Sequence, residues 1–328
     1  MSEHPFNKPI GGFLPLELPR GEEYHPSAIH LNSARYALEY VLRIKSYKKI
    51  YLPAYICDSV LQPIKRLHLA TAFYRLDQQF MPVLERDPEK DACLLYVTYF
   101  GVTRAAAEIV SRRFKHVIID NTQAFFEPPI AGTDTIYSAR KFFGVPDGGY
   151  LYTDSADRLT LTEDSSYYRC DGLLKQIDAG HDAALPLYME NEAYLDHCGM
   201  KQMAALTKRL LESINYPLVR AQRNRNFRQL HEALGRFNRL DLSAVKLNGP
   251  LCYPFLIERG ARLKNFLLDR KILVTDYWDD VLARVTPGSF EHQLETNLVA
   301  LPIDQTLSES DCASIIQSVR SFLDCLGG

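Results

Sequence analysis

Apolar positions along this chain follow two alternating patterns, one with the spacing of an α-helix and one with that of a buried strand. After Asn32 and Ser33, either of which can cap a helix, they recur at helical spacing. Residues 93–100, by contrast, form a nearly unbroken apolar run typical of a strand buried on both faces. In the first half the alternation predicts helices at 34–44, 58–67 and 105–114 and strands at 49–53, 71–76, 93–100 and 116–119. This repetition predicts a doubly wound, mostly parallel sheet covered by helices.

The second half of the chain has longer helical stretches and fewer strands. Residues 162–182 are polar and irregular, and helical patterns then run from 184 to 237, with a break expected near Tyr216 because Pro217 follows it. Further on, the pattern predicts strands at 250–257, 272–278 and 298–302 and helices at 261–269 and 308–326, the last one capped by Ser308 with Asp311. We therefore predict a large domain at 1–219 that begins with an arm at 1–25, and a smaller α/β domain at 220–328.

Composition and charge narrow the classes of function. The 328 residues are 46% hydrophobic, enough for a full core, and the net charge of −2 with both signs interspersed argues against binding to nucleic acid or an anionic membrane. The seven cysteines are scattered, which favours reduced thiols and argues against a zinc site. With no secretory pattern at the start and no apolar run of membrane-spanning length, we expect a cytosolic enzyme.

An acid and a lysine follow two successive predicted strands. Asp120 ends the apolar run at 116–119, and Lys141 comes just after another predicted strand and shortly before two glycines at 148 and 149. Ligands of doubly wound sheets bind at the carboxyl ends of the strands. The combination suits pyridoxal phosphate (PLP), because an acid can keep the pyridine nitrogen protonated while a lysine holds the aldehyde as a Schiff base and later moves a proton.

Further polar residues suit the other groups of this cofactor. Ser138 stands in an S-x-x-K tetrapeptide with Lys141, and such a serine can bind the cofactor phosphate. Ser33, Ala34 and Arg35 open the first predicted helix, and the N–H groups of a helix N-terminus bind dianions. We therefore expect both segments to contact the phosphate of the cofactor.

Gln123 follows Asp120 by three residues, which places an amide within reach of the phenolic oxygen of the ring. Two alternatives remain open for these polar residues. Asp120 and Gln123 can instead form a helix capping box. Ser138 can instead be the nucleophile of an S-x-x-K acyl-transfer enzyme, although the Ser-Asp-Asn and Lys-Thr-Gly motifs of that class do not occur downstream.

Several of these segments, taken in order, resemble one family. The chain resembles a divergent member of the DegT/DnrJ/EryC1/StrS sugar aminotransferases, which are fold type I PLP enzymes. The segments that carry the resemblance are Asn32-Ser33-Ala34-Arg35-Tyr36-Ala37-Leu38, Leu52-Pro53-Ala54-Tyr55, Asp120-Asn121-Thr122-Gln123, Lys141 with Gly148-Gly149, and Ala300-Leu301-Pro302-Ile303 before the closing helix. They run along nearly the whole chain.

The resemblance implies a fold type I aminotransferase with a mostly parallel central sheet flanked by helices and a smaller C-terminal α/β domain. It further implies a homodimer that moves an amino group from an amino acid, glutamate in this family, to a keto sugar linked to a nucleotide, by a ping-pong mechanism. Lys141 would carry the cofactor and Asp120 would face its ring nitrogen. Tyr55 would be the aromatic residue that stacks on the ring.

Two departures from the family pattern leave alternative functions open. Ala34 replaces the central glycine of the phosphate segment, and the family's asparagine motif is not recognisable between 160 and 200. A non-catalytic or regulatory protein that keeps the fold is therefore one alternative. Another is a different PLP-dependent reaction such as a dehydratase, but those relatives replace the lysine with histidine, and Lys141 argues against that branch.

Overall fold

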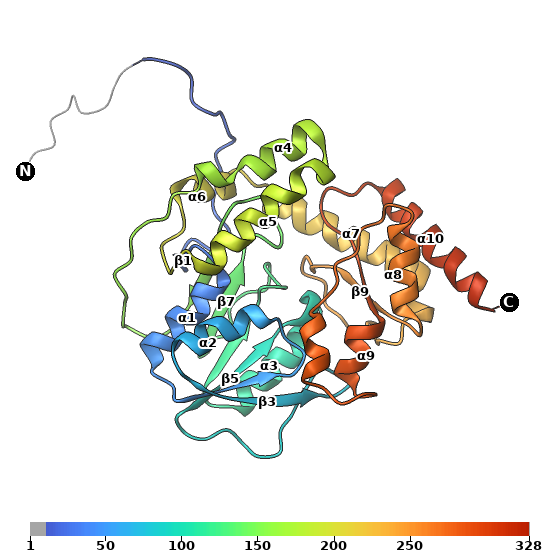
Figure 1. The fold of residues 1–328 in the computed structure, drawn as a ribbon, viewed down its shortest axis with the longest axis horizontal. Coiled ribbons are helices and arrows are strands. Elements are labelled where there is room, and N and C mark those ends of the chain that lie inside the picture. The colour runs from blue at the N-terminus through green and yellow to red at the C-terminus, as the bar shows by residue number, and fades with distance from the viewer. Residues whose placement is uncertain (1–10, 328) are drawn as a thin grey trace, which may run out of the picture.

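The computed structural model describes residues 11–327, which form a large mixed sheet covered by helices and a smaller C-terminal layer (Figure 1). Residues 1–10 of the expected arm lie outside the described residues. The order of strands in the large sheet is β1-β8-β7-β6-β5-β2-β3-β4. These strands are β1 (Ile29–Leu31), β2 (Lys49–Pro53), β3 (Ala70–Leu76), β4 (Pro82–Val83), β5 (Ala92–Val97), β6 (Val117–Asp120), β7 (Asp134–Ser138) and β8 (Gly149–Tyr152).

The centre of this sheet is parallel, which confirms the predicted fold class. Strands β3, β2, β5, β6 and β7 pair in parallel, while β8, β1 and β4 add antiparallel pairs toward the two edges. All six residues of β5 are buried, as its unbroken apolar run requires. The predicted strand at 93–100 ends early, however, because Phe100 takes a left-handed φ of 56° in the short 3-10 turn η2 (Tyr99–Gly101).

Helices cover the sheet and connect its strands. The N-terminal ones are α1 (Ala34–Lys45), the 3-10 turn η1 (Asp58–Val60), α2 (Leu61–Arg66) and α3 (Arg104–Arg113). α1 packs on β7 and β8, and α3 packs on β5 and β6. Ser33 caps α1 as predicted, since its hydroxyl accepts a hydrogen bond from the N–H of Tyr36 at 3.4 Å.

Four helices fill the middle of the chain. They are α4 (Asp171–Ala179), α5 (His181–His197), α6 (Ala205–Glu212) and α7 (Tyr216–Leu234), with short 3-10 turns η3 (Tyr167–Arg169) and η4 (Gly235–Phe237). The interpretation of 162–182 as irregular was wrong over α4, a nine-residue helix that ends at Gly180 and pairs with α5 as a hairpin. The break expected near Tyr216 is confirmed. Pro217 sits in the first turn of α7, where its missing N–H leaves no helical bond unmade, and Asn215 caps that helix.

The C-terminal layer is built on a two-stranded antiparallel sheet of β9 (Tyr253–Leu256) and β10 (Leu298–Leu301). Its helices are α8 (Gly260–Leu268), the 3-10 turn η5 (Asp279–Ala283), α9 (Phe290–Asn297) and α10 (Glu309–Gly327). Ser308 and Asp311 form the predicted capping box of α10, with the Ser308 N–H donating to Asp311 at 2.8 Å and the Asp311 N–H to Ser308 at 3.2 Å.

The predicted strand at 272–278 was wrong. Lys271 and Trp278 take left-handed φ values of 58° and 63° at either end of it, and only Thr275 makes a β-bridge, with Ala300. The domain boundary at 219 and 220 falls inside the first two turns of α7 and stays a prediction. Within residues 11–327, no helix has the length and apolar character needed to cross a membrane.

The described part of the arm is anchored by His25. Its Nε2 lies 3.0 Å from the Phe125 carbonyl oxygen and its Nδ1 lies 3.2 Å from the Tyr152 hydroxyl, so the neutral ring donates to one and accepts from the other. Burial lowers the pKa of His25 from 6.5 to about 4. Protonation in the folded state is therefore disfavoured, and the unfolded chain binds the extra proton first as the pH falls.

We expect the free energy of unfolding to fall as the pH drops from 6.5 to 4, by about 3 kcal/mol from His25 alone. The full stabilisation is present well above pH 6.5, because the His25 ring is then neutral in both the folded and the unfolded protein. Chemical denaturation at pH 6.5 and at pH 4.5 measures the loss of unfolding free energy. In His25→Gln the part of this loss that comes from His25 should disappear. His181→Gln, which replaces a half-exposed histidine, is the matched control. Equal pH dependence in both variants would contradict the assignment to His25.

Candidate active site

The predicted acid and lysine meet at one edge of the large sheet. β6 ends at Asp120 and its parallel neighbour β7 ends at Ser138, with Asp120 opposite Ile136 in the register. Lys141 follows β7 by three residues, in a tight turn rather than a helix. The carboxyl ends of parallel strands lie at the same edge, and this edge therefore presents both groups together.

Thr122 connects the two charged groups. Its backbone N–H donates to Oδ1 of Asp120 at 2.8 Å, and its hydroxyl oxygen lies 3.2 Å from Nζ of Lys141, which donates to it. Asp120 is 5% exposed, whereas Lys141 is exposed and free to contact a ligand. Sequence reasoning missed Thr122, although its place between the acid and the glutamine was a usable signal.

The environment of Asp120 suits a cationic partner. Burial raises the pKa of Asp120, and the nearby Lys141 ammonium and the hydrogen bond from Thr122 oppose that rise. A buried carboxylate of this kind gains most from a positively charged N–H group placed against its second oxygen. A protonated pyridine nitrogen is such a group.

Gln123 presents an unpaired amide in the same region. Its Oε1 accepts a hydrogen bond from the N–H of Phe100 at 2.6 Å, and its fully buried Nε2 has no partner among residues 11–327. A buried NH₂ group without a partner is costly, which favours a ligand oxygen beside it. The alternative capping-box interpretation was wrong, because no helix begins at Asp120 and Gln123 bonds to Phe100 instead.

The two segments predicted to bind phosphate lie side by side. Ser138 is opposite Gly149 on β8, and Gly149 is in turn opposite Leu31 on β1. A Cβ atom at Gly149 would lie 2.2 Å from the carbonyl carbon of Ser33, so only glycine allows β8 to approach the start of α1 this closely. The hydroxyls of Ser33 and Ser138 and the N-terminus of α1 therefore share one small region, to which the helix dipole attracts an anion.

The side chain of Arg35 is directed elsewhere. Its guanidinium forms an ion pair with Asp196 at 2.7 Å and donates to the Leu195 carbonyl at 2.9 Å, both near the end of α5. Ala34 is partly exposed beside it. These two residues therefore offer backbone N–H groups, rather than a charged side chain, toward the region of Ser33 and Ser138.

Tyr55 follows β2 and is completely buried. Its ring centroid is 4.8 Å from that of Trp278 and 5.8 Å from that of Tyr99, and its hydroxyl has no partner in the described part of the chain. Tyr99 follows β5, the strand between β2 and β6, and donates from its hydroxyl to the Tyr55 carbonyl at 2.7 Å. Tyr99 therefore lies one strand nearer to Asp120 than Tyr55 does, and sequence reasoning did not single it out.

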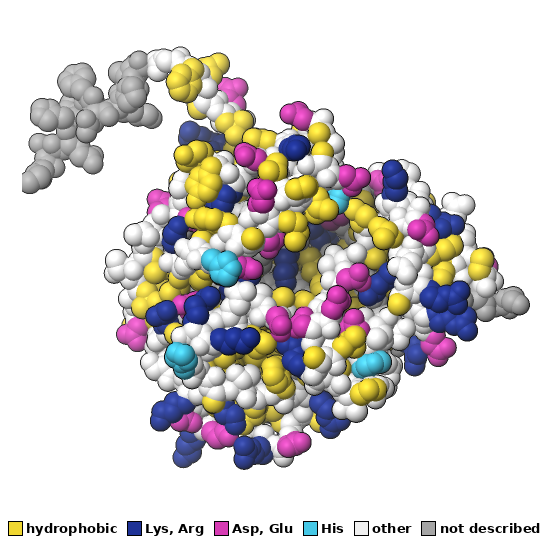
Figure 2. All heavy atoms as spheres, in the orientation of Figure 1, with side chains coloured by type: hydrophobic (Ala, Val, Ile, Leu, Met, Phe, Trp, Pro, Cys, Tyr) yellow, Lys and Arg dark blue, Asp and Glu magenta, His cyan; other side chains and the backbone are white. Residues whose placement is uncertain are grey.

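The face of the molecule shown in Figure 2 is hollowed near its middle, and basic side chains lie in the hollow. In the same orientation, α5 lies above this region, α7 lies to its upper right, and the C-terminal elements lie on its right side (Figures 1 and 2). The large sheet and the C-terminal layer thus enclose a depression between them.

Known structures share the fold of this chain, although no protein-family model and no curated protein matches the sequence. The sugar aminotransferase CalS13 from Micromonospora echinospora superposes with a TM-score of 0.61 at 14% identity, covering 90% of this chain and 87% of its own. A DegT DnrJ EryC1 StrS aminotransferase from Brucella abortus gives 0.57 at 17% identity, covering 90% and 85%. The PMP form of Spr1654 from Streptococcus pneumoniae gives 0.54 at 13% identity, covering 89% and 86%.

The chain has the fold of the DegT/DnrJ/EryC1/StrS aminotransferases. The resemblance seen in the sequence is thereby confirmed at the level of the fold, over nine-tenths of the chain.

The groups at the sheet edge of this aminotransferase fold fit PLP. Asp120 is a buried carboxylate for the ring nitrogen, Gln123 has an unpaired amide for the phenolic oxygen, and Lys141 has an exposed amine for the aldehyde. Ser33 and Ser138 stand where the phosphate would bind at the start of α1. Each functional group of the cofactor therefore has a residue of suitable chemistry.

Proposed function

We propose that this protein is a PLP-dependent aminotransferase that moves an amino group from an amino acid to a keto sugar. The observation that carries this proposal is the chain of contacts Asp120–Thr122–Lys141 at the carboxyl edge of the sheet. Glutamate as the donor, a nucleotide-linked sugar as the acceptor and a ping-pong order are inferred from the shared fold.

Bound PLP would supply an electron-withdrawing ring that makes the α-proton of the amino acid acidic. Asp120 would hold the ring nitrogen in its cationic form, because a buried carboxylate favours a proton on its partner. Ser33 and Ser138 would hold the phosphate, and Gln123 would orient the phenolic oxygen. Tyr55 is proposed as the stacking aromatic, with Tyr99 beside it.

Lys141 has two tasks in this proposal. Its amine would bind the cofactor and, once displaced by the donor, would carry a proton between two carbon atoms. Both tasks need the neutral amine, and the Thr122 hydroxyl, which accepts a hydrogen bond from Nζ, keeps the amine near Asp120. In the second half of the reaction Lys141 would return the proton in the reverse direction as the acceptor takes the amine.

The visible absorption spectrum of the purified protein tests the proposed function. We expect absorption from bound PLP that falls when glutamate is added and returns when a keto sugar acceptor follows. A protein that binds no PLP in a titration would contradict the proposal. Bound PLP that no amino acid alters would favour the non-catalytic alternative, for which the replacement by Ala34 and the diverted Arg35 side chain are the supporting observations.

We further propose a cytoplasmic homodimer. All seven cysteines are free thiols, in keeping with a reducing compartment. The α4–α5 hairpin exposes Leu174, Ile177 and Met189 by 55 to 83%, and hydrophobic side chains are visible over these helices in Figure 2. Contiguous exposed apolar side chains of this kind are typical of an interface, and a second copy of the chain fits the fold best. The interface should bury more than roughly 2,000 Å² in total.

Light scattering at low micromolar concentration is expected to give a dimer mass or a multiple of it. Introducing a charge with Ile177→Asp should weaken the dimer at least about tenfold, because the carboxylate would lose its hydration at an apolar interface. Ile109→Asp on α3 is the matched control, since Ile109 is also an exposed isoleucine of a helix. A monomer that retains bound PLP, or equal effects of the two variants, would rule out the hairpin interface.

A further inference from the structure

The turn that precedes β8 is held on three sides. The carbonyl of Pro146 accepts a hydrogen bond from Nδ2 of Asn191 at 2.8 Å, and the N–H of Gly148 donates to the Asn32 carbonyl at 3.0 Å. Between them, the Asp147 side chain is completely buried and pairs with Arg169 at 3.1 Å. Gly148 takes a φ of +124°, a conformation that residues with a Cβ rarely adopt.

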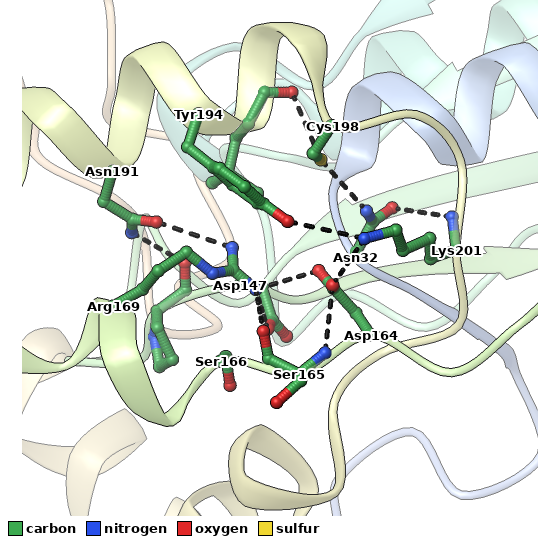
Figure 3. A network of polar contacts seen from close by, with 12 residues as sticks. Asn32, Asp147, Asp164, Ser165, Ser166, Arg169, Asn191, Tyr194, Cys198 and Lys201 are labelled. Carbon is green, nitrogen blue, oxygen red and sulfur yellow. Dashed lines mark hydrogen bonds and ion pairs between the residues drawn. The ribbon is translucent and has the colours of Figure 1, made fainter.

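Arg169 is the centre of a buried polar network (Figure 3). Besides Asp147, its guanidinium contacts Asp164 at 2.8 Å and donates to Oδ1 of Asn191 at 3.5 Å, and it lies over the ring of Tyr194 at 4.5 Å from the centroid. Lys201 contacts the other oxygen of Asp164 at 3.0 Å. The negative charges of the two carboxylates thus equal the positive charges of Arg169 and Lys201 in number, and both cations contact Asp164.

The same network reaches the first residues of the phosphate segment. The N–H of Asn32 donates to the Lys201 carbonyl at 3.0 Å, and Nδ2 of Asn32 donates to the Gly199 carbonyl at 2.9 Å. Asn32 immediately precedes Ser33, the cap of α1. The network therefore holds both the turn at 146–149 and Asn32, the residue before the cap. The close contact between Gly149 and Ser33 joins these two segments.

Removing Arg169 would leave Asp147 without a cation. Burial already raises the pKa of Asp147, an effect that Arg169 opposes. A buried carboxylate that loses its partner must take up a proton or move toward water. Movement of Asp147 would carry Gly148 and Gly149 with it and open the contact with Ser33.

We propose that Arg169 is a positioning residue for the phosphate of the cofactor. By binding Asp147 it keeps the start of β8 packed against the N-terminus of α1, and this packing sets the geometry of the anion site there. This inference rests on the proposed function. In this proposal Arg169 acts through Asp147 rather than by touching the cofactor, because its buried guanidinium is engaged by Asp147, Asp164 and Asn191.

The test compares PLP with pyridoxal, which has the same ring and aldehyde but lacks the phosphate. Dissociation constants of the apo-protein for both are measured by absorbance titration. We expect Arg169→Met to weaken PLP binding at least about tenfold, equal to about 1.4 kcal/mol, and to change pyridoxal binding less than about twofold. Arg169→Lys, which restores the charge but not the fork of donors, should recover part of the loss.

The control is Arg86→Met, which removes an arginine whose side chain is 76% exposed and whose ion pair with Glu89 lies at the surface. If Arg169→Met does not fold, Asp147→Asn carries the test, because it keeps the shape and removes the charge that Arg169 holds. Equal losses for both ligands, or no loss for either, would overturn the positioning role. A wild-type protein that binds PLP no better than pyridoxal would instead refute the proposed phosphate site and with it the proposed function.

Discussion

Lys141→Ala is expected to lower the rate of amino transfer at least about a thousandfold, because one residue is proposed both to bind the cofactor and to move the proton. The contact of Nζ with Thr122 at 3.2 Å places the amine beside Asp120, and the substitution leaves no amine there. The rate of transfer from glutamate measures the loss. In the wild-type protein, borohydride reduction should attach the cofactor to the peptide that contains Lys141.

Lys48→Ala is the matched control for this experiment. Its side chain is 81% exposed and forms an ion pair with Asp91, at 3.6 Å, on the surface. We expect it to leave both the rate and the labelled peptide unchanged. A cofactor found on a peptide with a different lysine would show that Lys141 is not the attachment site, whatever the effect of the alanine on the rate.

Asp120→Asn is expected to slow transfer by about a hundredfold or more while PLP still binds. The amide keeps the shape of the side chain and can still accept the hydrogen bond of the Thr122 N–H, and the phosphate and Lys141 contacts remain. It cannot hold a positive charge on the ring nitrogen, and each ~1.4 kcal/mol of lost transition-state stabilisation costs tenfold in rate. Single-turnover rates with saturating PLP separate this effect from weaker binding.

Asp134→Asn is the matched control, because it replaces another buried aspartate of the same sheet. Asp134 begins β7, at the opposite edge from the proposed site, and its carboxylate accepts a hydrogen bond from Thr153 at 2.5 Å. We expect this variant to lose stability but to keep its rate. If Asp120→Asn transfers the amine as fast as Asp134→Asn, Asp120 has no role at the ring.

Much of the fold was predictable because its signals are local. The strands β2, β3, β5 and β6 were predicted to within a few residues from their apolar runs, and α1 and α10 were predicted together with their caps. The errors arose where a short pattern is ambiguous. Residues 272–278 are rich in apolar and aromatic side chains, yet left-handed residues at both ends prevent an extended strand.

The candidate site was predictable in part. Asp120 and Lys141 stand out because each follows a predicted strand, and parallel topology brings such ends together. The segment Ser33–Arg35 was expected to bind the phosphate and stays a prediction, but the sequence did not show that the Arg35 guanidinium binds Asp196, which lies 161 positions further along the chain. Thr122 could have been found from its place between Asp120 and Gln123, whereas Tyr99 has no signal of its own, since a tyrosine after a strand is ordinary.

The sequence by itself determined the alternation of strands and helices, the caps at Ser33 and Ser308, and which side chains end β6 and β7. Periodicity and capping depend on residues three or four positions apart, and such relations are visible in the chain. Only the tertiary structure decided that Gly149 meets Ser33 and that Arg169 holds Asp147. Those contacts join segments that are distant in sequence, and their geometry depends on how whole elements pack, because a buried charge takes the partner that packing brings within reach.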